Sequence, residues 1–154
     1  MAGLYFEEFV VGKKYLHPIR RTVTQYDNIS FSCLTLNTQP LHIDADWSSK
    51  NPPYNKPLFN SMFTLALMTG MQVTDLTLGT TFGNLGFSEI EFPNPVFEGD
   101  TLWATTTILG KRESKSKKDR GIVEFQHEMF NQNNVLVCTC KRKGMMRMKS
   151  SIKA

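Results

Sequence analysis

The sequence predicts an α+β domain in which an antiparallel sheet surrounds one apolar helix. Residues 60–74 are apolar on nearly every helical face and carry no charge, which is typical of a helix that other elements cover. Four later segments alternate apolar and polar residues or are rich in β-branched residues, and polar turns separate them, as in antiparallel strands. A sheet is therefore the expected cover of the helix.

The first third of the chain is expected to supply a strand and a helix. An apolar and aromatic stretch at 5–11 comes first. Residues 14–23 mix β-branched and basic side chains and predict a strand, with Pro18 at an edge or a bulge because proline cannot donate a ladder hydrogen bond. Thr24 is a good N-cap for a helix that must end before Pro40.

The middle and the end of the chain are expected to supply the central helix and its cover. Residues 44–50 predict a polar turn or a short helix, which the break at Asn51-Pro52-Pro53 follows. Asn60 or Ser61 is expected to cap the central helix. The four expected strands are residues 84–92, 101–110, 121–130 and 134–142.

Length and composition favour one ordinary globular domain over residues 1–154. The chain is 40% hydrophobic and 21% charged, which argues against disorder or a fibrous protein. Its three cysteines are odd in number and lack Cys-x-x-Cys spacing, so we expect neither a disulfide framework nor a metal site. No apolar run approaches the length of a membrane span and residues 1–8 do not resemble a secretory signal, so we expect a cytoplasmic protein without membrane partners.

The charge balance argues against a nucleic-acid partner. The formal net charge is only +4, and the basic residues gather at 112–120 and 141–153. Stacking aromatic residues are not interleaved with these charges, as they are in proteins that bind nucleic acids. A small partner that carries a few phosphates suits this balance better.

Three histidines are the candidates for acid–base chemistry. His17 and His127 lie in predicted strands without a partner pattern, and we expect both to be structural. His42 follows the first predicted helix in a segment expected to be irregular, where functional side chains concentrate. The residues alone leave two roles open for His42, a hydrogen bond to Asp44 and catalysis.

Residues 35–42, Thr-Leu-Asn-Thr-Gln-Pro-Leu-His, resemble the signature of a known family. In the MaoC-like, (R)-specific enoyl-CoA hydratases the signature is Ser/Thr-Gly-Asp-x-Asn-Pro-Leu/Ile-His. Residues 24–31 and 54–62 are similar to the family's segments before the signature and before the central helix, and 92–102 resemble its Pro-Val-x-x-Gly-Asp-x-Leu turn. The resemblance implies a hot-dog fold, in which an antiparallel sheet wraps the long central helix.

The resemblance also implies a reaction, the reversible addition of water across C2–C3 of an acyl-CoA thioester. Coenzyme A is then part of the substrate, and no separate cofactor is expected. The thioester oxygen gains negative charge in the transition state and needs N–H donors, which the start of a helix offers. The resemblance places this donor near Asn60 and Ser61, for which helix capping is a compatible second role.

The chain departs from the family signature at three positions. Leu36 replaces the glycine, Asn37 the aspartate and Gln39 the asparagine. An amide has no titratable proton near neutral pH, so we expect Asn37 to orient a water while His42 acts as the single acid and base. Gln39 is expected to help bind the substrate, and Asp44 is a second candidate for the missing carboxylate.

The residues of the motif most resemble those of the subgroup that contains mesaconyl-CoA hydratases, also called β-methylmalyl-CoA dehydratases. This resemblance implies a short, branched dicarboxylyl-CoA as substrate. The basic residues between 112 and 120 are a candidate site for the coenzyme A phosphates, although a solvated hairpin tip is the interpretation we favour. They are Arg112, Lys115, Lys117, Lys118 and Arg120.

Two other functions remain open at this stage. An acyl-CoA thioesterase needs a carboxylate that activates water, often in the central helix, and residues 60–74 contain none. A catalytically lapsed subunit that only binds acyl-CoA is the second alternative, because Asn37 replaces the family's aspartate. For all three functions we expect a homodimer or a higher assembly, because one hot-dog unit leaves a sheet edge open and the resemblance implies that two units pair.

Overall fold

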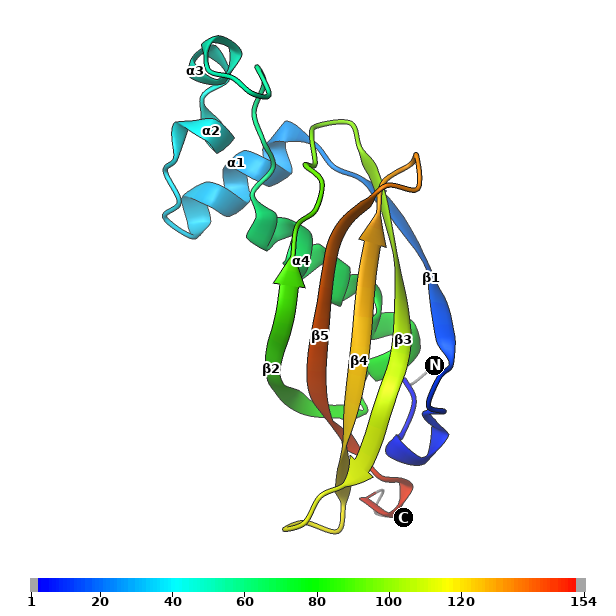
Figure 1. The fold of residues 1–154 in the computed structure, drawn as a ribbon. Helices are drawn as coiled ribbons and strands as arrows, with labels where there is room; N and C mark the ends of the chain where they lie inside the picture. The colour runs from blue at the N-terminus through cyan, green and yellow to red at the C-terminus, as the bar shows by residue number, and fades with distance from the viewer. Residues whose placement is uncertain (1–2, 152–154) are drawn as a thin grey trace.

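A computed structural model describes residues 3–151, so Lys153 of the predicted basic group 141–153 lies outside the described residues. Helices and strands are segregated along the chain, as in an α+β fold, with all strands but the first after the long helix (Figure 1). In chain order the elements are the 3-10 turn η1 (Phe6–Glu8), β1 (Lys14–Thr22), α1 (Gln25–Leu34), α2 (Pro40–Ile43), α3 (Ala45–Lys50), α4 (Ser61–Met71), the π-helical turn η2 (Val73–Thr77), β2 (Thr81–Glu91), β3 (Thr101–Glu113), β4 (Arg120–Phe130), β5 (Leu136–Arg147) and the 3-10 turn η3 (Lys149–Ser151).

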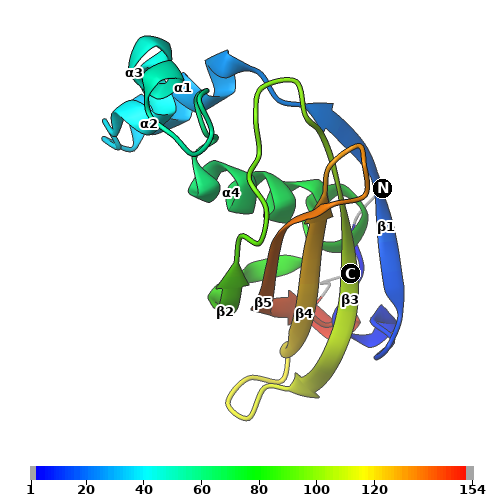
Figure 2. The ribbon, with the colours of Figure 1, turned by 45° about the horizontal axis from the view of Figure 1, so that its top comes forward.

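The five strands form one antiparallel sheet that curves around α4. Their order across the sheet is β1-β3-β4-β5-β2, so β1 and β2 are the two edges. Figure 2 shows α4 lying in the hollow of the curve, and α1, α2 and α3 lie beyond one end of the sheet, next to the start of α4. The predicted fold class, an antiparallel sheet wrapped around a central helix, is confirmed.

Local sequence signals account for the elements near the site. The backbone N–H of Thr24 donates to the Asp27 carboxylate at 2.9 Å, which fixes the start of α1. The pairing of β1 with β3 shifts register between Leu16 and Arg20, around Pro18, as expected of a proline in an edge strand. Both predictions from the sequence, the N-cap and the irregular edge strand, are confirmed.

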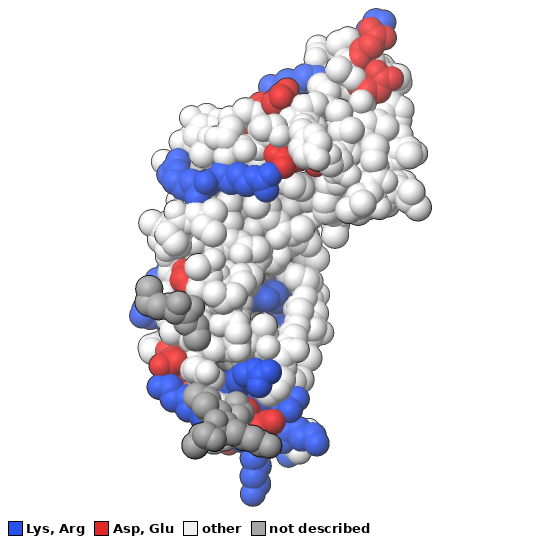
Figure 3. Space-filling model, turned by 180° about the vertical axis from the view of Figure 1, so that it is seen from behind, with Lys and Arg blue, Asp and Glu red and all other residues white. Residues whose placement is uncertain are grey.

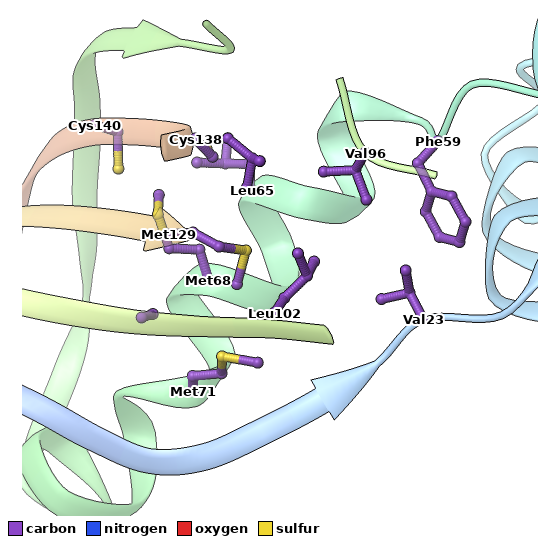
Figure 4. Close-up of a cluster of buried hydrophobic side chains, with 12 residues drawn as sticks. Val23, Phe59, Leu65, Met68, Met71, Val96, Leu102, Met129, Cys138 and Cys140 are labelled. Carbon is purple, nitrogen blue, oxygen red and sulfur yellow. The ribbon is translucent and has the colours of Figure 1, made fainter. Parts of the chain in front are cut away.

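The main core lies between α4 and the middle of the sheet. Leu65 and Met68 of α4 point toward Leu102, Met129 and Cys138 of the strands (Figure 4), and all five side chains are buried. Burial raises the pKa of the Cys138 thiol to about 12, so this thiol stays protonated and packs as an apolar group.

Two expectations about burial are wrong. The sequence predicts a helix that is covered all round, but Met62 is 53% exposed and Ala66 and Gly70 are also exposed. The alternation at 84–92 predicts a half-buried strand, but no residue of β2 is buried. The reason is geometric, because α4 packs mainly on β3, β4 and β5 and leaves one of its own faces and the edge strand β2 uncovered.

A second core cluster closes the other end of the sheet. Phe9 packs edge-to-face against Phe125 with ring centroids 5.7 Å apart, and Phe6 and Leu76 are buried beside them. The apolar stretch at 5–11 thus covers this end of the sheet with buried aromatic side chains. Within residues 3–151, no helix is long and apolar enough to cross a bilayer.

Shortening Met68 to alanine is expected to destabilise the domain by about 2–5 kcal/mol, because its fully buried side chain leaves a cavity between α4 and the sheet. Urea unfolding followed by circular dichroism measures this change. Met62→Ala, on the exposed face of the same helix, is the control and is expected to change the free energy of unfolding by about 0.5 kcal/mol or less. Equal effects of the two substitutions would contradict this packing.

Candidate functional site

His42 lies in the short helix α2 rather than in the irregular segment predicted from the sequence. Pro40 starts this helix, because a proline at the first helical position loses no hydrogen bond. The His42 side chain is buried (9% exposed), and its Nδ1 lies 2.8 Å from the carbonyl oxygen of Leu58. A carbonyl can only accept, so Nδ1 carries the proton and Nε2 of the neutral ring keeps a lone pair.

No hydrogen bond joins the side chains of Asp44 and His42 in the described part of the chain, although the sequence suggested that Asp44 binds His42 or replaces the missing carboxylate. The Asp44 carboxylate instead accepts a hydrogen bond from the backbone N–H of Trp47 at 2.8 Å and caps α3. Its side chain is exposed, and it neither orients the His42 ring nor replaces the family's aspartate in this arrangement.

The fully buried side chain of Asn28 joins three segments around His42. Its Nδ2 donates to the carbonyl oxygens of His42 at 2.9 Å and Leu58 at 3.0 Å, and its Oδ1 accepts from the backbone N–H of Asn60 at 2.9 Å. Sequence reasoning missed this residue. Nothing in the chain distinguishes Asn28 from the other polar residues of α1, because all three of its partners are backbone groups of distant segments.

The start of α4 offers one unoccupied amide. The N–H of Asn60 is taken by Asn28, and the N–H of Met62 donates to Oδ1 of Asn60 at 3.0 Å. Over the residues that the structure describes, no acceptor is recorded for the N–H of Ser61, the first residue of the helix. The two predicted residues therefore differ in their hydrogen bonds: Asn60 caps the helix, and the N–H of Ser61 has no acceptor among the described residues.

Asn37 and Gln39 follow a residue in the left-handed backbone region. Leu36 has φ of +59° and is 84% exposed, which explains why the family signature has glycine at this position. Asn37 is half-buried and Gln39 is exposed, and both line an open hollow of about 460 Å³ between α1 and α2. The side chain of Asn37 accepts a long hydrogen bond, 3.4 Å, from the backbone N–H of Gln39, and no bond joins it to His42 within the described part of the chain.

A smaller cavity lies beside the start of α4. Its volume is about 130 Å³, and it is lined by Leu58, which accepts the hydrogen bond from His42, and by Ser61. The remaining lining residues are uncharged and come from three segments. They are Tyr54, Phe59, Thr64, Phe92, Pro93, Asn94, Pro95, Val96 and Val137.

The family of the chain follows from its sequence. Residues 7–129 match the family model described as MaoC like domain, which is well over half of the chain. The chain belongs to the MaoC-like family. This result agrees with the signature around His42 in the sequence and with the central helix and curved sheet of the structure.

Two curated relatives of this MaoC-like chain are named as a hydratase and a dehydratase of acyl-CoA thioesters. The mesaconyl-CoA hydratase of Cereibacter sphaeroides is 27% identical over 97% of this chain and 43% of the relative. The β-methylmalyl-CoA dehydratase of Chloroflexus aurantiacus is 28% identical over 94% of this chain and 40% of the relative. This chain thus spans less than half the length of these two curated relatives.

Solved structures support the fold. The monoamine oxidase regulatory protein from Archaeoglobus fulgius superimposes with a TM-score of 0.84 at 29% identity, and the alignment covers 97% of each chain. A Mycobacterium tuberculosis protein described as having a double hotdog fold superimposes with a TM-score of 0.82 at 18% identity over 99% of this chain and 46% of that one. The MaoC-like chain is therefore one hot-dog unit.

The basic cluster lies far from His42 within this unit. Residues 114–119 form the hairpin between β3 and β4, and Figure 1 shows this hairpin at the end of the sheet opposite α1, α2 and α3. Arg120 is paired with its neighbour Asp119 at 2.7 Å, which lowers the pKa of that carboxyl. Within residues 3–151, no group of three or more His, Cys, Asp or Glu side chains is arranged to hold a metal ion.

Replacing Asn28 by alanine is expected to destabilise the MaoC-like domain by about 2–4 kcal/mol, because three buried backbone groups lose their partner at once. Thermal and urea unfolding measure the loss. Ser30→Ala, on the same helix and half-buried, is the matched control and is expected to change stability by about 0.5 kcal/mol or less. Asn28→Ala with wild-type stability would show that the amide does not hold these segments together.

Proposed function

We propose that this MaoC-like unit belongs to a hydro-lyase that adds water across C2–C3 of an enoyl-CoA thioester or removes it. The observation that carries this proposal is the hydrogen bond from Nδ1 of His42 to the Leu58 carbonyl. It leaves Nε2 of the neutral ring as a proton acceptor, and it ties the ring to Leu58, which lines the same cavity as Ser61 with its unoccupied N–H. A base and an N–H donor are the two groups that this reaction needs.

In the proposed reaction His42 moves one proton twice. Nε2 takes a proton from the water as its oxygen bonds to C3, while the C2–C3 electron pair shifts toward the thioester and its oxygen becomes negative. The N–H of Ser61 donates to that oxygen. His42 then returns the proton to C2, which restores the thioester carbonyl and the neutral ring. No group other than the substrate's own coenzyme A is needed as a cofactor in this sequence.

Asn37 and Gln39 are proposed to act on the water and the substrate rather than on the proton. The half-buried Asn37 amide can donate to or accept from a water but cannot take its proton. Gln39 is exposed at the rim of the same hollow, where it can contact a bound thioester. The lone imidazole, rather than an Asp–His pair, then carries the acid–base chemistry.

A short acyl group is the proposed substrate class. The cavity beside Ser61 has a volume of only about 130 Å³, which favours a four- or five-carbon acyl group over a long chain. The names of the two curated relatives point the same way, to mesaconyl-CoA and its hydrated product β-methylmalyl-CoA. We therefore propose a short, branched dicarboxylyl-CoA.

The two alternatives receive less support. A thioesterase would need a carboxylate at the site, and α4 carries no acidic residue between Ser61 and Met71. A subunit that only binds acyl-CoA would not need an oriented imidazole with a free Nε2. Turnover distinguishes all three functions.

A second hot-dog unit is proposed to complete the site. The edge strand β2 has no neighbour on its outer side and exposes Leu85, Phe87 and Ile90. The relatives are more than twice as long as this chain, which is consistent with two units in one polypeptide. We infer that the present chain is a single domain and that a second copy pairs with it along β2.

The reaction is tested by incubating the protein with crotonyl-CoA, mesaconyl-CoA and a longer enoyl-CoA and measuring the masses of the products by mass spectrometry. A gain of one water on mesaconyl-CoA is expected. His42→Gln is expected to lower this rate by about a hundredfold or more, because general acid–base catalysis contributes roughly that much. Release of coenzyme A would identify a thioesterase, and bound but unchanged substrate would identify the lapsed subunit.

Asn37→Asp tests the departure from the family signature. If the amide only orients water, a carboxylate at this position is expected to keep the hydratase active, with a change in its pH profile because a second titratable group enters the site. The profile of kcat/KM between about pH 5 and 9 records this change. Complete loss of hydration with intact folding would show that the amide N–H2 is required.

Light scattering coupled to size-exclusion chromatography tests the second unit. A mass of two chains or more is expected for the wild-type protein. Ile90→Lys, which places a charge on the exposed edge strand, is expected to shift the mass to one chain, because edge lysines oppose strand pairing. A wild-type monomer with full hydratase activity would contradict the proposal.

A further inference from the structure

A second hollow, of about 360 Å³, lies between the C-terminal half of α4 and β2. It shares no lining residue with the cavity beside Ser61. Its lining is uncharged except for Arg142 of β5. Figure 3 shows the back of the molecule, where blue atoms lie inside a recess surrounded by white, uncharged side chains.

Arg142 reaches this hollow from the inner side of the sheet, the side of Cys138 and Cys140. Its Nε donates to Nε2 of His127 at 3.0 Å, and the guanidinium carbon lies 4.8 Å from the centre of the Phe125 ring. Nη2 is buried and has no hydrogen-bond partner among the described residues. Burial lowers the pKa of Arg142 to about 10, so the group is still charged at neutral pH.

A directional chain of hydrogen bonds holds Arg142 in place. Because the guanidinium can only donate, Nε2 of His127 accepts, and Nδ1 of His127 must carry the proton that goes to Thr106 at 2.8 Å. The Thr106 hydroxyl then donates to Nε2 of His17 at 2.7 Å, and Nδ1 of His17 donates to Asp75 at 2.8 Å. Burial and the charge of Arg142 lower the pKa of His127 well below its usual value, which keeps this ring neutral as the chain requires.

This series of hydrogen bonds does not neutralise the charge of Arg142 at the hollow. The carboxylate of Asp75 is at the other end of the series, which crosses four strands, and no acidic residue lines the hollow. Arg142 is half-buried, and a cation that is partly withdrawn from water without a paired anion is costly. An anion bound to its guanidinium would lower this cost.

We propose that this hollow binds a small carboxylate-bearing ligand, whose carboxylate is held by the guanidinium of Arg142. A carboxylate matches the planar edge of a guanidinium, and the volume suits a short carbon chain. Ala66, Val73 and Phe87 line the hollow and can cover the apolar part of the ligand. Gln72 Oε1, also buried without a partner among the described residues, can accept from a hydroxyl group on it.

This site is distinct from the proposed hydratase site, with which it shares no lining residue. Its ligand is therefore a free carboxylic acid rather than the acyl group of the thioester, because the distal carboxylate of mesaconyl-CoA is attached to C3, the carbon that water attacks. The proposal does not depend on the proposed function.

Calorimetric titration of the whole protein with butyrate, butyramide and inorganic phosphate tests the site. Butyrate is expected to bind and butyramide not, because only the first carries the charge. Arg142→Met is expected to weaken butyrate binding at least about tenfold. Lys143→Met is the matched control, with the same loss of charge on the next residue of β5, and should leave binding within about twofold. Equal binding of butyramide, stronger binding of phosphate, or unaffected binding in Arg142→Met would overturn the proposal.

A second measurement follows binding to the wild-type protein, in which Arg142 is retained. Nitrogen-15 spectra of the wild-type arginine side chains, with the Arg142 signal assigned from Arg142→Lys, are expected to show a saturable shift of its Nε–H with butyrate and none with butyramide. A signal that does not move with butyrate would overturn the site even if the methionine variant fails to fold.

A matched pair of thioesters checks that the two sites are separate. If Arg142→Met lowers kcat/KM for mesaconyl-CoA about tenfold or more but not for 2-methylcrotonyl-CoA, the carboxylate belongs to the substrate and the proposal of a separate site is overturned. If both rates stay unchanged while butyrate binding is lost, the ligand is a free carboxylic acid. Should the protein hydrate neither thioester, the proposed function fails, while calorimetry and the arginine spectrum still decide the anion site.

Discussion

The arrangement of the site depends on the buried side-chain amide of Asn28. Its two donors and its acceptor bind backbone groups of α2, of the segment before α4 and of the residue that caps α4. Because amide hydrogen bonds are directional, these segments can satisfy Asn28 in one relative position only. That position brings the Leu58 carbonyl to the His42 ring, and it occupies the Asn60 N–H, while the next amide, that of Ser61, has no acceptor among the described residues.

The other constraint is that one curved sheet cannot cover one helix completely. The strands β3, β4 and β5 bury Leu65 and Met68, but Met62, Ala66 and Gly70 stay exposed on the opposite face. The hollow with Arg142 lies between this uncovered face and the unpaired edge β2. A second unit along β2 would therefore both extend the sheet and close the side of the hollow.

Much of the fold could be predicted from the sequence, because its signals are local. The proline in β1, the Thr24 cap and the charge-free central helix each act within a few residues, and the resemblance around residues 35–42 added His42. What could not be predicted depends on contacts between distant segments. Asn28 looks like any polar helix residue until α2 and α4 are packed against it.

Arg142 is a second residue whose environment could not be predicted from the sequence. In the sequence it is one of several basic residues between 141 and 153, and nothing in the sequence separates it from the others of that group. Strand alternation places Lys143 outside and Arg142 inside, where a row of buried polar groups from β4, β3 and β1 receives it. A charge count along the chain does not distinguish these two environments, whereas the pleat of β5 does.

The protonation of the His42 ring decides whether the site can work as described. Long-range proton–nitrogen correlation of the imidazoles at about pH 8, where a histidine of ordinary pKa is neutral, measures it directly. The His42 signals can be assigned by their loss in His42→Gln. A proton on Nδ1 and a bare Nε2 are expected, since the Leu58 carbonyl fixes this form. A proton on Nε2 with a bare Nδ1 would mean that the bond to Leu58 is absent and that the proposed base has no lone pair to offer.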